Sequence, residues 1–217
     1  MKATKIASAV AVAAFAVSGA AIAGPGWTFV EVGYGYGDND MGNIGPGVGS
    51  NNGNSVYEDG TKGYTLDGSL SFGSMYHVAL QYAKGDYYEG PTWLSESERK
   101  SYSGIVGIHP AVTDATDLVL ELNYTKTEYS GFAEDTLKDT GGGIRTGLRS
   151  MLSDTVEANA FIGIQKTDYK DVEVAAELGG AWSFAANWAL TADAKIGESE
   201  TQIGAGIRWY LGQYNNL

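Results

Sequence analysis

The sequence has no cysteine, only four prolines and no long apolar run after its first residues. Without cysteine the chain can form no disulfide, use no thiol in catalysis and carry no lipid anchor on a cysteine. Lys and Arg number 14 against 26 Asp and Glu, a net charge of −12 that argues against nucleic-acid binding, which needs basic patches. No later segment is long enough for a transmembrane helix, so a membrane-embedded chain would have to be a closed β-barrel.

The first 23 residues are typical of a cleaved signal peptide. Lys2 and Lys5 give a basic start, residues 7–17 are almost entirely apolar, and residues 21–23 supply a small-x-small cleavage site. The apolar run is shorter than the ~20 residues that a spanning helix requires. We therefore expect a signal peptide over 1–23 and a mature domain over 24–217, whose net charge would change from −12 to −14 because the removed segment holds two lysines and no acid.

Apolar residues recur at alternate positions, which is the period of a β-strand and not of a helix. Residues 118–125 read Leu-Val-Leu-Glu-Leu-Asn-Tyr-Thr, with the leucines and the tyrosine on one face. The prolines fall between the segments that show this pattern, as strand hydrogen bonding requires. We count ten such segments, near residues 27–36, 63–73, 76–84, 101–109, 117–128, 140–150, 155–166, 171–182, 188–196 and 201–211.

Residue size indicates which face of the sheet points outward. Large apolar residues lie on one face of each segment, and glycine, alanine, serine and acidic residues lie on the other. The concave side of a closed sheet is crowded, so this distribution favours an apolar exterior. We predict an all-β fold, an antiparallel up-and-down transmembrane β-barrel of about ten strands, with eight strands as the alternative count. A secreted soluble barrel with the large apolar face inside is the competing interpretation.

Connection lengths and aromatic positions indicate an orientation in the membrane. Residues 37–61, 85–100 and 130–139 form longer connections that alternate with shorter ones, as in barrels with long external loops and short periplasmic turns. With both mature ends in the periplasm, aromatic residues collect at the two ends of the strands, where membrane interfaces would lie. The outer girdle is Tyr34, Tyr36, Tyr64, Tyr82, Tyr102 and Tyr124, and the inner girdle is Phe72, Tyr76, Trp182, Trp188 and Trp209.

The last predicted strand, Gly206-Ile207-Arg208-Trp209-Tyr210-Leu211, has a glycine followed by apolar residues at alternate positions. With this strand, the chain resembles the small outer-membrane β-barrels of Gram-negative bacteria, the OmpA/OmpX-like superfamily. The resemblance implies that Gly206, Trp209 and Leu211 form an assembly signal, although residues 212–217 follow it where the signal usually ends the chain. It also implies contacts with outer-membrane lipid, with the barrel-assembly machinery and with periplasmic chaperones, but no particular activity.

The predicted inward faces carry more acidic than basic residues. One interpretation is a lumen closed by salt bridges, and the other is a narrow cation-preferring pore lined by carboxylates. Ten strands leave little more space than eight, whose interior side chains just fill, so a closed lumen is favoured. The residues are Glu31, Asp67, Glu121, Arg145, Arg149, Glu157, Glu173, Glu177, Asp193, Lys195 and Arg208.

Few residues are candidates for catalysis or metal binding. His77 and His109 are the two histidines, and both fall at the periplasmic ends of strands, away from an active site on the outer rim. Asp38 and Asp40 carry oxygen ligands at alternate positions and are a candidate calcium site, but a distal glutamate is missing. We expect no enzyme activity and no cofactor. The predicted role is structural or surface-interacting, through the outer loops, with the narrow pore as the alternative.

Overall fold

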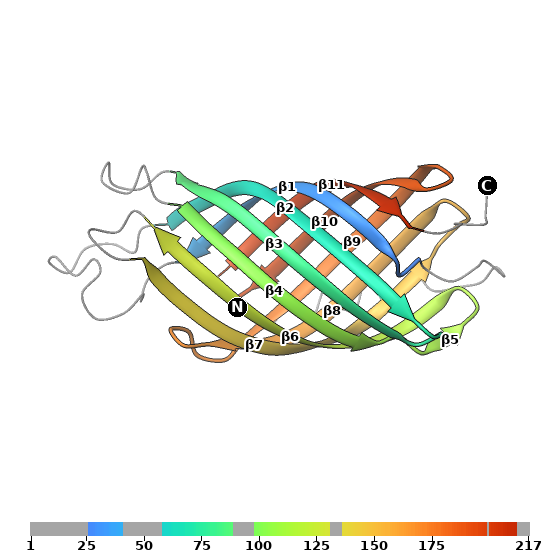
Figure 1. Cartoon of the computed structure of the whole chain (residues 1–217), viewed down its shortest axis with the longest axis horizontal. Coiled ribbons are helices and arrows are strands. Elements are labelled where there is room, and N and C mark those ends of the chain that lie inside the picture. The colour runs from blue at the N-terminus through green and yellow to red at the C-terminus, as the bar shows by residue number, and fades with distance from the viewer. Residues whose placement is uncertain (1–25, 41–57, 89–97, 131–135, 199, 212–217) are drawn as a thin grey trace, which may run out of the picture.

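The computed structural model describes residues 26–40, 58–88, 98–130, 136–198 and 200–211, and these form antiparallel strands arranged as a barrel (Figure 1). Within the described residues no helix is long and apolar enough to cross a membrane. The strands are β1 (Phe29–Asp40), β2 (Glu58–Phe72), β3 (Tyr76–Tyr88), β4 (Glu98–Ile108), β5 (Ala111–Thr113), β6 (Thr116–Ser130), β7 (Leu137–Met151), β8 (Val156–Thr167), β9 (Glu173–Ala185), β10 (Trp188–Gly197) and β11 (Glu200–Tyr210).

The sheet closes on itself because its first and last strands pair. Apart from β4 and β5, each strand pairs with its neighbour in the chain. β1 pairs with β11, and β4 pairs directly with β6. Among the described residues ten strands therefore circle the barrel, which confirms the predicted fold and the predicted count. Closure leaves no unpaired sheet edge, the requirement for a sheet inside a membrane.

The two ends of the barrel differ. Phe29 at the start of β1 pairs with Tyr210 at the end of β11, and the turns β2–β3, β7–β8 and β9–β10 lie at this same end, here called the inner end. The last residues of β1, β3 and β6 and the first residues of β2, β4 and β7 lie at the opposite, outer end (Figure 1). Two of the connections at the outer end, between β8 and β9 and between β10 and β11, are about as short as the inner turns.

The large apolar side chains point away from the barrel interior. Leu120, Ile162 and Ile207 are exposed on the outer surface, whereas the side chain of Glu121, next to Leu120, points inward and Glu121 is only 4% exposed. A soluble barrel would bury the first three and expose the last. The soluble interpretation is therefore wrong, because a surface with this much exposed apolar area requires lipid around it.

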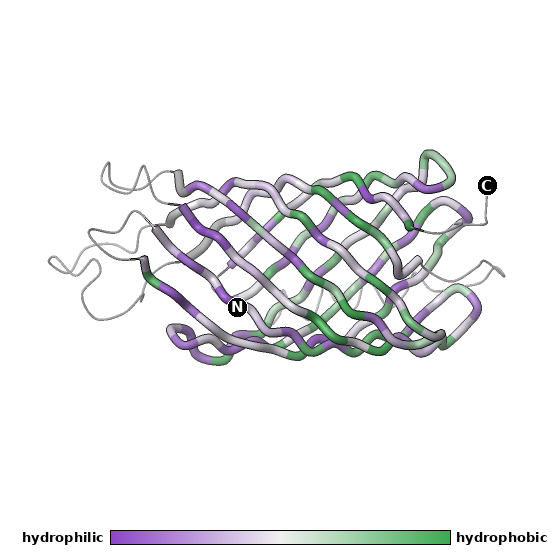
Figure 2. Tube along the Cα trace, viewed as in Figure 1, coloured by the Kyte–Doolittle hydropathy of each residue, from purple (hydrophilic) through white to green (hydrophobic). Residues whose placement is uncertain are grey.

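The strands reach further toward the outer end than the sequence predicted. Residues 37–61 and 85–100 were expected as connections, but β1 continues to Asp40, β2 begins at Glu58, and β3 and β4 pair from Asp86 and Glu98 inward. Figure 2 shows that the strands become more hydrophilic toward this end. Backbone pairing continues there without an apolar face, so apolar alternation, the signal used for prediction, ends before the strands do.

The connection expected over residues 109–116 also contains a strand that was not predicted. The three residues of β5 pair with the start of β6 and form a small hairpin at the inner end. A strand this short offers too few alternating positions to be recognised from its sequence.

Candidate functional site

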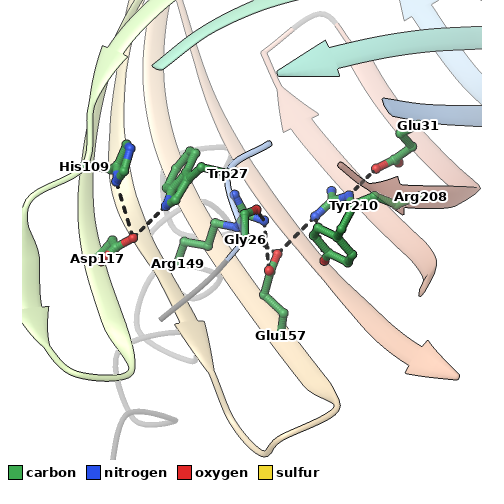
Figure 3. A network of polar contacts seen from close by, with 9 residues as sticks. All are labelled: Gly26, Trp27, Glu31, His109, Asp117, Arg149, Glu157, Arg208 and Tyr210. Carbon is green, nitrogen blue, oxygen red and sulfur yellow. Dashed lines mark hydrogen bonds and ion pairs between the residues drawn. The ribbon is translucent and has the colours of Figure 1, made fainter. Parts of the chain in front are cut away.

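The candidate site is the barrel interior, and its inner end is filled by a cluster centred on Trp27. The indole ring stacks on His77 and on His109, with centroid distances of 4.6 and 4.2 Å, and its Nε1 donates a hydrogen bond of 2.6 Å to Asp117. The Arg149 guanidinium lies 4.4 Å from the indole ring, in cation–π contact (Figure 3). We call these five residues the inner plug.

Local sequence places Trp27 inside. Alternation along β1 turns Glu31 inward, and Phe29 and Trp27 follow at intervals of two, so the inward face continues beyond the first residue of the strand. Two hydrogen bonds hold this segment: Arg149 Nη2 donates to the Gly26 carbonyl at 2.7 Å, and the Leu211 amide donates to the Thr28 carbonyl at 2.9 Å. The segment preceding β1 is therefore anchored within the inner end.

A chain of ion pairs runs across the barrel above the inner plug. Arg149 makes two hydrogen bonds of 2.8 Å to the Glu157 carboxylate, a paired geometry that is strong for guanidinium and carboxylate. Arg208 donates to Glu157 at 3.2 Å and to Glu31 at 2.7 Å, and Thr191 donates to Glu31 at 2.7 Å (Figure 3 shows all but Thr191). These contacts link β7, β8, β11, β1 and β10 through the interior.

A second group of ion pairs lies beside the first and shares β7 with it. Arg145 on β7 bonds to Glu121 on β6 and, at 2.5 Å, to Glu177 on β9. His77 Nε2 on β3 lies 2.9 Å from Glu121 Oε1, which connects this group to the inner plug. His77 and Glu157 are each 2% exposed, so solvent does not reach the inner half of the lumen.

The middle of the lumen holds side chains that are accessible to solvent. Gln81 and Asp193 are exposed there, and within the described residues no ion pair reaches Asp193 or Asp67.

Toward the outer end the inward-facing side chains are packed again. Tyr129 is buried there, and Glu200 lies 3.4 Å from Lys195 and 3.8 Å from Arg99. The interior is thus polar, closed at its inner end and accessible in its middle.

The structure brings together most, but not all, of the charged residues predicted to line the lumen. Two of them pair at the outer rim and not with the central network: Glu173 lies 3.7 Å from Lys170, and Lys195 pairs with Glu200. Asp67 and Asp193 lie in the middle of the lumen. The residues in the central ion-pair network are Glu31, Glu121, Arg145, Arg149, Glu157, Glu177 and Arg208.

Trp27, Asp117 and the two histidines were not among the predicted lumen residues. A signal for them was nevertheless present, because alternation assigns Trp27 to the face of Glu31 and Asp117 to the face of Glu121. The missing information was three-dimensional, since their ring stacking joins residues 77, 109 and 27.

The inner plug offers no evident catalytic arrangement. Burial lowers the pKa of His109, although Asp117 Oδ2, 3.6 Å from its Nδ1, acts in the opposite direction. Within the described part of the chain, no group of three His, Asp or Glu side chains could hold a metal ion. Asp38 and Asp40, the candidate calcium ligands, lie in the outer end of β1, and their side chains are outside the described part of the structure.

The aromatic residues of the predicted girdles point outward at both ends. Neighbouring tyrosines approach each other at the outer end, with ring centroids 5.2 Å apart for Tyr82 and Tyr102, and Trp188 stacks on Trp209 at 5.9 Å at the inner end. From Tyr64 to Phe72, β2 covers about 26 Å, or about 20 Å along the barrel axis at a tilt of about 40°. That separation is comparable with the apolar band of about 25 Å in such barrels.

The predicted assembly signal lies at the closing seam of the barrel. Gly206 and Trp209 belong to β11, which pairs with β1, and Leu211 directly follows that strand. Gly206 has no room for a side chain, because a Cβ would come within 2.8 Å of both Thr191 Oγ1 and the Val32 carbonyl oxygen. Close packing at the seam is therefore a sufficient reason for a glycine at position 206, whether or not this residue also serves as part of an assembly signal.

Comparison with solved structures supports the fold. The NanC porin matches with a TM-score of 0.51 and 7% identity, over 84% of this chain and 100% of that chain. Neisserial surface protein A matches with a TM-score of 0.44 and 12% identity, over 84% of this chain and 96% of that chain. The attachment invasion locus protein Ail of Yersinia pestis matches with a TM-score of 0.40 and 18% identity, over 85% of this chain and 99% of that chain. No protein-family model and no curated protein matches the sequence. By its closed sheet and its apolar exterior, the chain is a small transmembrane β-barrel, and it shares its fold with the NanC porin.

Proposed function

We propose that the protein is a non-conducting barrel of a Gram-negative outer membrane, with a structural or surface-interacting role at its outer end. The observation that carries this proposal is the closure of the inner half of the lumen. Trp27, His77 and Arg149 fill its end, and the pairs of Arg149, Glu157 and Arg208 cross it above. An ion entering from outside would meet these buried, closely packed side chains.

The same arrangement supports a non-enzymatic role. Histidine is the usual acid or base of a hydrolase, and both histidines are buried in the inner plug, far from the outer surface where an external substrate would arrive. The water-accessible part of the lumen contributes Asp67 and Asp193, without a histidine or a cysteine beside them among the described residues.

A narrow cation-preferring pore is the second candidate. The observation in its favour is that Asp67 and Asp193 lie in the middle of the lumen without an ion-pair partner within the described residues. Unpaired carboxylates are the groups that attract cations in a pore. For conduction, however, the inner plug would have to move.

Planar-bilayer conductance of the purified barrel tests both candidates. We expect no ohmic step from the wild type and a small, cation-selective conductance from the double variant Trp27→Ala/Arg149→Ala, which removes the centre of the inner plug. Phe72→Ala, which shortens an aromatic side chain on the outer surface, is the matched control and should not conduct. A regular ohmic step from the wild type would contradict the non-conducting barrel and favour the pore. In that case Asp67→Asn/Asp193→Asn should reduce the cation preference of the conductance.

A further inference from the structure

Lysines collect in one band of the lipid-facing surface. Alternation along the strands gives them the same outward direction as the tyrosines of the outer girdle, and those on β2, β3, β4 and β6 each lie two residues beyond a girdle tyrosine toward the outer end. Within the described residues, the remaining lysines lie elsewhere: Lys170 in a turn and Lys195 in the lumen. The members of this lysine band are Lys62, Lys84, Lys100, Lys126, Lys138 and Lys166.

The register couples the band to the tyrosines. Tyr36 pairs directly with Lys62, Tyr64 with Lys84, and Tyr102 with Lys126. A step of two residues moves a side chain by about 7 Å along a strand. If the tyrosines lie at the membrane interface, the ammonium groups therefore lie among the lipid headgroups, where long basic side chains extend from apolar surface into the polar layer.

The band keeps positive charge available. Glu98 accepts hydrogen bonds from both Lys84 and Lys100, the latter at 2.5 Å, so one carboxylate is shared by two lysines that face each other across β3 and β4. Lys126 pairs with Glu128 at 2.7 Å. Within the described part of the chain, no ion pair engages Lys138 or Lys166. All of this lies in a chain with a net charge of −12, so the band is a local reversal of the overall charge.

We propose that the lysine band binds the phosphate groups of anionic lipid headgroups in the leaflet at the outer end. Six ammonium groups spread over β2 to β8 form a curved line along the wall and not a convergent pocket, which suits a row of headgroups better than a single small anion. Lysine binds phosphate as a point charge and needs no fixed geometry. The inference rests on the barrel's position in the membrane and is independent of whether the lumen conducts.

Binding of phosphatidic acid to the full barrel in phosphatidylcholine nanodiscs tests the proposal. The triple variant Lys84→Gln/Lys100→Gln/Lys126→Gln should bind phosphatidic acid on the order of tenfold to a hundredfold more weakly than the wild type, since each surface lysine contributes a factor of several. Glu98→Gln should bind more tightly, because it frees two lysines. Lys170→Gln, in the β8–β9 turn, is the matched control and should bind as the wild type does.

The two directions of change separate lipid binding from simple structural support. If the ion pairs served only the stability of the barrel, the triple variant and Glu98→Gln would shift in the same direction or leave lipid binding unchanged, and either result would overturn the proposal. Inorganic phosphate at equal concentration should leave the lipid bound; complete competition would show a free-phosphate site instead. If the triple variant does not fold, Lys100→Gln and Glu98→Gln still provide the opposed pair.

Discussion

The ion pairs around Glu157 should contribute strongly to stability. This carboxylate is 2% exposed and accepts two hydrogen bonds from Arg149 and a third from Arg208. Glu157→Gln keeps the shape of the side chain but leaves two buried guanidinium groups facing each other without the shared negative charge. Breaking a buried pair in this way costs about 3–5 kcal/mol, roughly a hundredfold to several thousandfold in the folding equilibrium.

Equilibrium unfolding of the barrel in urea, in vesicles of fixed composition, measures this effect. The matched control is Glu173→Gln, because Glu173 is partly exposed at the outer rim and lies 3.7 Å from Lys170, so its loss should cost about 0–1 kcal/mol. A free energy of unfolding for Glu157→Gln within about 1 kcal/mol of the wild type would refute the assignment of Glu157 as the junction of the interior network.

Three further predictions test other parts of the structure. Burial lowers the pKa of His109 below its unfolded value of about 6.5, so the fold favours the neutral ring. The free energy of unfolding should therefore fall as the pH drops through that unfolded pKa, and His109→Gln should reduce this pH dependence in unfolding measurements between about pH 7 and pH 5. Brominated lipid should quench the fluorescence of a variant whose one tryptophan is Trp209, and it should not quench a variant whose one tryptophan is Trp27. Strong quenching of the Trp27 variant would place this side chain outside the barrel. Gly107→Ala should destabilise the barrel by about 1–3 kcal/mol, because a Cβ there would lie 2.4 Å from the His77 ring. Gly104→Ala on the same strand places its Cβ in open space and should leave the stability nearly unchanged. Equal effects of the two substitutions in thermal unfolding would contradict the packing described.

The fold was predictable because a membrane barrel imposes a strict alternation on its strands. Leu120 and Glu121 show this, since one contacts lipid and its neighbour joins the lumen network, as residue size indicated. The outer ends of β1 to β4 were not predictable by the same means. There the outward face carries charged side chains such as Lys62 and Lys100, so the apolar alternation ends although the backbone still pairs.

The interior was predictable in composition but not in arrangement. Alternation assigned Arg145 and Glu177 to the lumen, yet their contact joins strands that are not neighbours in the sheet, β7 and β9. The inner plug depends on Trp27 entering the barrel from the segment before β1 and stacking between two histidines, and no local pattern encodes that stacking.

Labelling of single cysteines tests most directly that the inner end of the lumen is closed while its middle admits solvent. The chain has no cysteine of its own, so Asp193→Cys, in the accessible middle, and Val119→Cys, buried at 0% exposure on the inward face of β6, each introduce a single thiol. With a small maleimide added to the folded, purified barrel, Asp193→Cys should react and Val119→Cys should not. Equal labelling of the two variants, or labelling of Val119→Cys alone, would contradict the closed inner end.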